Sequence, residues 1–157
     1  MKKTPIDPAS QARAMLDRAR RYCALDEQCE SSVRQKLIVW GAHPTDVDPI
    51  VGTLRAEGYL DDMRYARAYC ESKMLGQHWS RQKTIYQLRL KHLPKEAIDS
   101  GLAAVPDESY MEMLRALAAK RTAELAESDA IDADRKLVSF LLGRGFTMDE
   151  INKATNN

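Results

Sequence analysis

Six basic residues and no acidic ones fall between residues 73 and 95: Lys73, Arg81, Lys83, Arg89, Lys91 and Lys95. The segments on either side hold 11 basic and 11 acidic residues (1–72) and seven basic and 12 acidic residues (96–157). The net charge of +1 therefore conceals a positive centre. Such a centre suits phosphates or carboxylates of a partner, although a run of charges can also serve only as a solvated face.

The spacing within this segment places three of its side chains in a row. Lys83, Gln87 and Lys91 recur every four residues, so on a helix predicted over residues 79–92 they form a stripe about 12 Å long. We predict two apolar faces on either side of it, one containing Thr84 and Leu88 and the other containing Tyr86 and Leu90, so this helix should contact neighbours on two sides. A row of cations on a rigid helix can bind an anionic partner at little ordering cost.

The side chains that could support catalysis do not form a recognisable site. No glycine-rich phosphate loop precedes a Lys-Ser or Lys-Thr pair, and no nucleophile elbow occurs. The histidines, His43, His78 and His92, do not fall at metal-ligand spacing. Asp61 and Asp62 suit the start of a helix better than a paired-carboxylate site, since adjacent residues point in different directions. We expect no enzyme activity, no cofactor and no metal.

The three cysteines point to a reducing compartment. Cys23, Cys29 and Cys70 cannot all pair within the chain and form no Cys-x-x-Cys motif, so we expect buried free thiols in the cytoplasm. The charged N-terminus is followed by no apolar run, which predicts neither a signal peptide nor a membrane span.

The elements that must position the basic stripe repeat with a period near 50. Residues 19–23 (Ala-Arg-Arg-Tyr-Cys) recur as residues 66–70 (Ala-Arg-Ala-Tyr-Cys), 47 positions later, and Lys83 and Leu88 recur 53 positions later as Lys136 and Leu141. Repeats of this kind bury their apolar faces against their neighbours. Few glycines and prolines and many good helix formers predict helices throughout.

Each repeat is predicted to contain three helices, at 10–25, 29–40 and 44–57, then 61–76, 79–92 and 94–104, then 107–127, 131–143 and 147–155. The fold class is therefore an all-α, elongated tandem array of three three-helix repeats. We place the repeats at residues 10–57, 58–105 and 106–157, after a disordered N-terminal tail of residues 1–9. The aromatic residues Tyr22, Trp40, Tyr65, Tyr69 and Trp79 are predicted to pack in the core.

Two local motifs support these boundaries. Gly58 suits the end of a helix, and Asp61 suits the N-cap of the next, with Leu60 and Tyr65 placed as a hydrophobic staple. Thr147 and Glu150 form a predicted capping box at the start of the last helix.

These motifs, in their order, resemble the RecX family of small bacterial proteins. The resemblance rests on the stretch from Gly58 to Asp62 with Arg64 and Tyr65-Ala66, on Lys83 with Leu88, and on a block from Lys136 to Ile151 that contains Arg144-Gly145-Phe146. It covers residues 12 to 155. The chain departs from the family at Ser80 and His92, where glycine is common, and at Ser32, where an acidic residue is common.

The resemblance implies a regulator that binds the RecA nucleoprotein filament and inhibits RecA ATPase, strand exchange and RecA-stimulated LexA cleavage. The implied partners are the RecA filament and single- or double-stranded DNA, and we expect a monomer. Candidate binding residues are the six basic residues of the centre together with Arg64, Arg67, Arg135 and Arg144 from the flanking repeats.

Two other functions agree with the sequence. A stand-alone DNA-binding regulator would use the basic centre directly and would show a steep salt dependence. A helical-repeat adaptor for acidic peptides would use the same surface, although its usual repeats are shorter, at about 34 residues.

Overall fold

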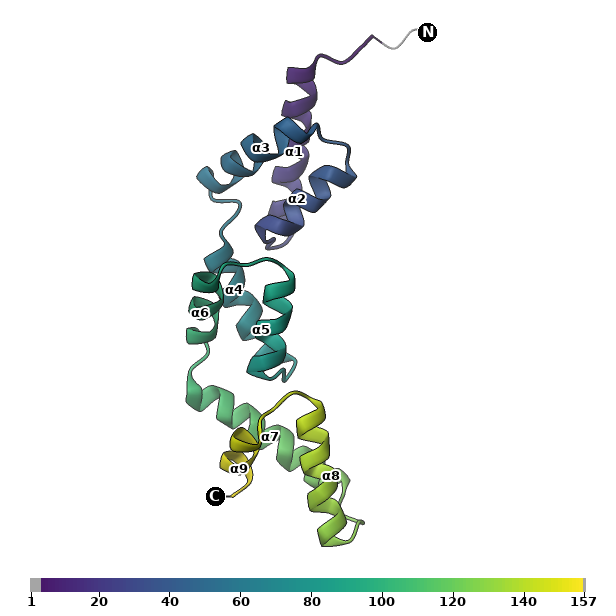
Figure 1. Ribbon diagram of the computed structural model, residues 1–157, viewed down its shortest axis with the longest axis vertical. Helices are drawn as coiled ribbons and strands as arrows, with labels where there is room; N and C mark the ends of the chain where they lie inside the picture. Colours follow the sequence, from purple (N-terminus) through teal and green to yellow (C-terminus); the bar gives the residue numbers. More distant parts are fainter. Residues whose placement is uncertain (1–3, 157) are drawn as a thin grey trace.

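The protein forms a row of helices that runs from one end of the molecule to the other (Figure 1). The computed structural model describes residues 4–156. Its helices are α1 (Pro8–Leu25), α2 (Glu30–Val39), α3 (Pro44–Ala56), α4 (Asp62–Cys70), the π-helical turn η1 (Glu71–Gly76), α5 (Arg81–Leu90), α6 (Lys95–Ala103), α7 (Asp107–Glu124), α8 (Ala130–Gly143) and α9 (Met148–Thr155). No strand occurs among residues 4–156, and the predicted all-α array is confirmed.

The helices group as unit 1 (α1–α3), unit 2 (α4, η1, α5 and α6) and unit 3 (α7–α9), one below another in Figure 1. Within the described residues, no helix combines the length and hydropathy that crossing a membrane would need. The division at residues 57/58 and 105/106 stays our proposal for the limits of the units.

The predicted tail is shorter than expected. Helix α1 already begins at Pro8, inside the segment 1–9 predicted to be disordered. Proline suits the first turn of a helix because its fixed φ is helical and its missing N–H would have no partner there. Residues 4–7 are non-helical, and residues 1–3 lie outside the described part of the chain.

The hydrophobic residues form two separate cores. Unit 1 buries Ala19, Val33, Leu37, Val51 and Leu54 in a core of its own. A second core runs through units 2 and 3 without a break and includes Met74, Leu88, Tyr110, Leu141 and Phe146. Cys29 is the residue of unit 1 that joins this second core.

The helix starts follow the predicted capping chemistry. The Asp61 carboxylate accepts a hydrogen bond from the Arg64 amide at 3.1 Å. At the last helix, the Thr147 hydroxyl accepts from the Glu150 amide at 3.1 Å while Glu150 Oε1 accepts from the Thr147 amide at 2.9 Å. Both predicted caps are confirmed, and each satisfies backbone donors that have no partner inside the helix.

The turn after the second helix of each unit has the same backbone conformation. Gly41, His92 and Gly145 have φ values of 85°, 58° and 93°. His92 therefore adopts the left-handed conformation that glycine adopts in the other two units. An ordinary residue costs about 1–2 kcal/mol in this region.

One face of α5 differs from the prediction. Thr84 and Leu88 are buried as expected, whereas Tyr86 and Leu90 are 61% and 56% exposed. The prediction that Tyr86 and Leu90 pack against a second neighbour was wrong, because no other helix covers more than part of these two side chains. A broad surface beside the lysine stripe is therefore left open.

Candidate anion-binding surface

Lys91 lies between two adjoining hollows on the surface of the array. One hollow, of about 460 Å³, is lined by residues of unit 1 that include Tyr22 and Lys36 and reaches Lys91. The other, of about 490 Å³, is lined by Tyr69 and Lys73 and also reaches Lys91. Both hollows are lined by Lys91, one on the side of unit 1 and one within reach of Tyr69, and we call the pair of them the Lys91 groove.

Aromatic rings line up along the part of this surface that belongs to unit 2. Tyr65 stacks on Tyr69 with ring centroids 5.7 Å apart, and Tyr69 meets Trp79 edge-on at 6.1 Å. All three side chains are half-buried, so the prediction that they are core residues holds only in part. Their rings support the inner core on one side and border the groove or its rim on the other.

Lysines lie against these rings. The Lys73 ammonium is 5.0 Å from the Trp79 ring centroid and the Lys83 ammonium is 4.3 Å from it. Lys91 lies 6.0 Å from the ring centroid of Tyr69. Contacts of this kind are worth about 0.5–1 kcal/mol at exposed sites, enough to orient a flexible side chain. Three members of the basic centre are thus gathered around two aromatic rings.

Similar clusters occur in the other units. In unit 1, Tyr22 meets Trp40 edge-on at 5.6 Å, with Lys36 5.6 Å from the Tyr22 ring. In unit 3, Phe140 lies between Arg121 at 5.0 Å and Arg144 at 5.8 Å. Every unit therefore carries an aromatic ring with at least one cation beside it.

The ten predicted binding residues fall into two groups. Lys73, Lys83, Lys91, Arg89 and Arg67 have no ion-pair partner among residues 4–156. The others are engaged: Arg64 pairs with Glu27, Arg81 with Asp107, Lys95 with Asp99 and Arg135 with Asp132.

The tenth residue, Arg144, holds two units together. Its guanidinium donates to the Gln77 carbonyl at 3.3 Å, although the side chain is exposed. The structure therefore brings Lys73, Lys83 and Lys91 together and places Arg64, Arg81 and Arg144 at the joints between units. An engaged cation has less to offer a partner than a free one.

Burial keeps the tyrosines of the groove neutral. It raises the pKa of Tyr69, and the neighbouring thiols of Cys70 and Cys29 act in the same direction. Burial likewise raises the pKa of Tyr22. These phenols remain protonated and can donate a hydrogen bond at neutral pH. The charge of the groove is therefore set by Lys36, Lys73 and Lys91 against Asp26 and Glu27.

Lys36 and Tyr22 were missing from the predicted site. The internal repeat could have identified Lys36, because it occupies in unit 1 the position that Gln87 of the predicted stripe occupies in unit 2, 51 residues later. Reading the stripe across units would have extended it into unit 1. Within the described residues, no cluster of His, Cys, Asp and Glu could hold a metal ion.

An array of three-helix units with an open charged groove is typical of helical-repeat binding proteins. The chain matches two family models, described as the second three-helix domain of RecX over residues 61–102 and the third over residues 107–155. Together these matches cover more than half of the sequence. The chain belongs to the RecX family.

Individual relatives support the same family assignment. The regulatory protein RecX of Clostridium acetobutylicum is 31% identical over 128 residues, covering 79% of this chain and 59% of that protein. The chain thus spans about three-fifths of the length of that relative. The regulatory protein RecX of Vibrio campbellii is 28% identical over 120 residues, covering 76% of each chain. These relatives are regulatory proteins by name, in agreement with the prediction that the chain is not an enzyme.

The fold also matches solved structures. The crystal structure of RecX from Lactobacillus salivarius superimposes with a TM-score of 0.86 at 20% identity, over 94% of this chain and 96% of that one. A second crystal structure of regulatory protein RecX gives a TM-score of 0.84 at 22% identity, over all of this chain and 81% of that one. The arrangement of all three units is therefore shared.

Proposed function

We propose that this chain is a cytoplasmic regulator that binds the RecA nucleoprotein filament and inhibits its ATPase, strand exchange and LexA-cleaving activities. Membership of the RecX family supports the RecA filament as the partner. The observation that carries the proposal for this chain is the Lys91 groove, where free lysines from units 1 and 2 gather beside half-buried tyrosines. An anionic surface of a filament fits this arrangement.

The length of the array suits a repeating partner. Units 1 to 3 follow one another along a single axis (Figure 1), and each displays a ring with at least one cation beside it. Regularly spaced contacts on an extended surface can engage several equivalent positions of a polymer. One molecule would then cover more than one RecA protomer and block both turnover and extension of the filament.

The test is RecA ATPase on single-stranded DNA with this protein titrated in. We expect inhibition by amounts below one molecule per RecA protomer. Reversing two charges with Lys83→Glu and Lys91→Glu should weaken inhibition, because attraction to an anionic surface becomes repulsion. The fold should survive, since neither side chain lies in a core and surface changes usually shift stability by about 0.5 kcal/mol or less.

A matched control reverses two charges in unit 3, away from both the groove and the Trp79 ring that Lys83 contacts. Lys120→Glu and Lys136→Glu alter exposed residues of unit 3 and change the net charge equally. Inhibition should be close to that of the parent. Equal weakening by the two double variants would assign the effect to net charge, and an unchanged RecA ATPase at large excess of the parent would refute the proposed function.

The aromatic rings favour one further candidate, a direct single-strand DNA contact. Bases stack on exposed aromatic faces and lysines follow the phosphates. Binding to single-stranded DNA without RecA, with a steep fall at higher salt, would support this candidate. Binding to acidic peptides alone would favour the adaptor.

A further inference from the structure

One of the two hollows of the Lys91 groove lies along a face of α2. This hollow, of about 460 Å³, follows the helix from Ser31 to Val39 and meets the last turn of α5 at Lys91. Over these residues α2 advances about 12 Å. The Ser31 hydroxyl donates to the Lys91 carbonyl, which fixes the end of α5 against the start of α2. We call this depression the α2 hollow.

The charges of the α2 hollow have one sign. Among residues 4–156, its lining includes Lys36, Lys91 and His92 but no aspartate or glutamate. Neither lysine forms an ion pair within the part of the chain that the structure describes. The other hollow of the groove, by contrast, contains Asp26 and Glu27. An anion in the α2 hollow therefore meets cations without a competing carboxylate.

Two exposed aliphatic side chains line the same hollow. Val39 is 69% exposed and Leu90 is 56% exposed, and they occupy the same position in units 1 and 2, 51 residues apart. The charged backbone of a nucleic acid gains little from aliphatic contacts, whereas an acidic protein segment can carry apolar side chains beside its carboxylates. The lining of the α2 hollow therefore fits a segment of protein better than a nucleic acid.

A third feature of this hollow is the strained backbone of His92. Its φ of 58° lies in the left-handed region, where units 1 and 3 carry Gly41 and Gly145. A residue other than glycine in this conformation often marks a functional site. His92 is exposed and lines the α2 hollow, so its imidazole can donate a hydrogen bond to a carboxylate that also contacts Lys91.

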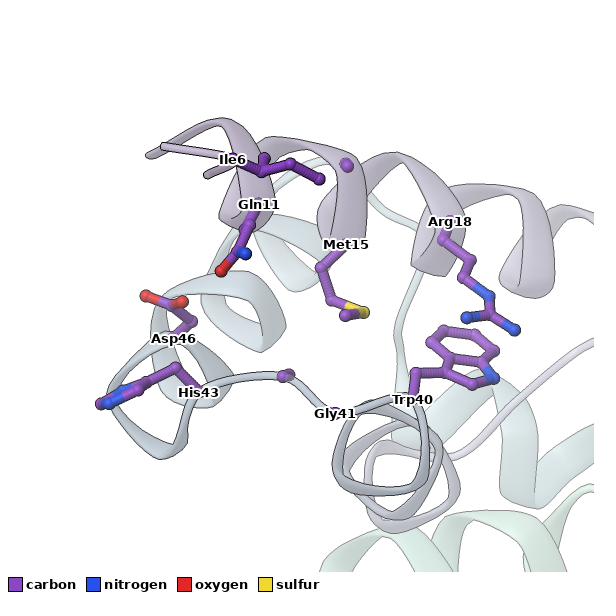
Figure 2. A pocket seen from close by; sticks show the side chains of 10 residues that line it. Ile6, Gln11, Met15, Arg18, Trp40, Gly41, His43 and Asp46 are labelled. Atoms are coloured by element: carbon purple, nitrogen blue, oxygen red, sulfur yellow. The ribbon is translucent and has the colours of Figure 1, made fainter. Parts of the chain in front are cut away.

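The equivalent turn of unit 1 lacks this combination. Figure 2 shows the cavity of about 360 Å³ beside Gly41, where the Arg18 guanidinium lies 4.2 Å from the centroid of the Trp40 ring and Asp46 adds a carboxylate. This cavity has charges of both signs, and its turn carries no side chain at Gly41. The basic lining and the left-handed His92 are thus features of the α2 hollow and not of every such turn.

We propose that the α2 hollow binds an acidic segment of a protein partner that also carries aliphatic side chains, and that His92 is one of its binding residues. The carboxylates of the segment contact Lys36, Lys91 and His92, and an aliphatic side chain packs on Val39 and Leu90. The identity of the partner rests on the proposed function, which assigns the segment to RecA. The chemistry of the segment can be tested without RecA.

Fluorescence anisotropy with labelled probes tests this chemistry. The probes are a synthetic peptide of repeated Glu-Glu-Leu-Glu blocks, the same peptide with serine in place of each leucine, and an oligothymidylate of equal net charge. We expect the leucine peptide to bind about tenfold more tightly than either of the others, because only this probe combines carboxylates with apolar surface.

Paired variants locate the aliphatic contact. Val39→Ser together with Leu90→Ser should remove the preference for the leucine peptide, and both positions are exposed, so the fold should be kept. Ile38→Ser is the matched control, since Ile38 is 61% exposed on the same helix but does not line the α2 hollow. This variant should keep the preference of the parent.

His92→Gly isolates the contribution of the imidazole. Glycine adopts the left-handed conformation readily, so the turn is kept while the side chain is lost. The affinity for the leucine peptide should fall about fivefold, as expected for the loss of one hydrogen bond. His78→Gly is the matched control, because His78 has a φ of 59° but does not line the α2 hollow, and it should bind like the parent.

Equal affinity of the parent for the leucine peptide and for either other probe overturns the proposal, as does an unchanged affinity of the His92→Gly variant. RecA ATPase measured in parallel separates this inference from the proposed function. Inhibition of RecA without binding of the leucine peptide overturns the inference alone. Binding of the leucine peptide without inhibition of RecA overturns the proposed function and supports the chemistry assigned to the hollow.

Discussion

The two joints of this array are built differently although their geometry is the same. Between units 1 and 2, the contacts are mainly polar, and unit 1 keeps a core of its own. Between units 2 and 3, the core continues through the joint. The comparison shows that joints between units of the same three-helix plan can differ in whether apolar side chains cross them.

The largest expected effect comes from Phe146, which is 2% exposed in the shared core and lies 6.2 Å from the Tyr110 ring. Phe146→Ala should lower the free energy of unfolding by about 3–5 kcal/mol. Because the core is continuous, amide hydrogen exchange should accelerate in units 2 and 3 together and stay unchanged in unit 1.

Leu37→Ala is the matched change in the other core. It should lower the free energy of unfolding by about 2–5 kcal/mol but accelerate amide hydrogen exchange only in unit 1. Alkylation of buried thiols gives a second measurement, with Cys23 in the first core and Cys70 in the second. Burial raises the pKa of the Cys70 thiol to about 11, so it reacts only when its core opens. Opening of all three units in both variants would refute the two-core description.

A medium effect is expected at the turns that follow the second helix of units 1 and 3. Gly145→Ala combines the strain of a positive φ, about 1–2 kcal/mol, with a clash against Ser80 that adds about 1–3 kcal/mol. Gly41→Ala carries the same strain but meets no atom within 4 Å. Urea unfolding should therefore show a clearly larger loss for Gly145→Ala. Equal losses would mean that the joint between units 2 and 3 is looser than the structure indicates.

A smaller effect of opposite sign is expected for His92→Gly. Glycine adopts the left-handed conformation of His92 without strain, which should stabilise unit 2 by about 1 kcal/mol. The greater conformational entropy that glycine gives the unfolded chain reduces this gain. Urea unfolding measures the difference. A loss of stability would show that the His92 side chain makes a contact worth more than the strain.

The smallest effect is expected for the polar joint. Arg64→Gln removes the pair with Glu27 and should cost about 0.5–1 kcal/mol, less at high salt. Arg20→Gln removes the pairs with Glu57 and Asp17 inside unit 1, on the exposed surface, and serves as the control within a unit. Only the Arg64 variant should change the overall dimensions in small-angle X-ray scattering. An identical scattering profile for both variants would show that the joint does not depend on this pair.

Much of the fold could be predicted because its signals are local. The caps at Asp61 and Thr147 depend on residues within four positions, and the period near 50 is visible in the sequence itself. The break between the two cores could not be predicted. It depends on which apolar side chains meet across a joint, and these residues are far apart in the sequence.

Only part of the candidate site could be predicted, because helical spacing relates residues of one helix and not residues of different units. Lys83 and Lys91 were found from helical spacing, but Lys36 belongs to another unit. Tyr86 and Leu90 were assigned to a second packed face because helical periodicity reports apolar character and not the presence of a neighbour. Ion pairs such as Arg81 with Asp107 join residues of different units, so spacing alone could not separate engaged cations from free ones.

Two cores in series also have a mechanical consequence. If tension is applied along the long axis, the polar joint between units 1 and 2 should yield first, because ion pairs at the surface give way with little resistance while a continuous apolar core must be sheared as a whole. We therefore expect units 2 and 3 to move as one body and unit 1 to move relative to them. A body of this kind could keep its grip on a partner that lengthens or twists during its working cycle.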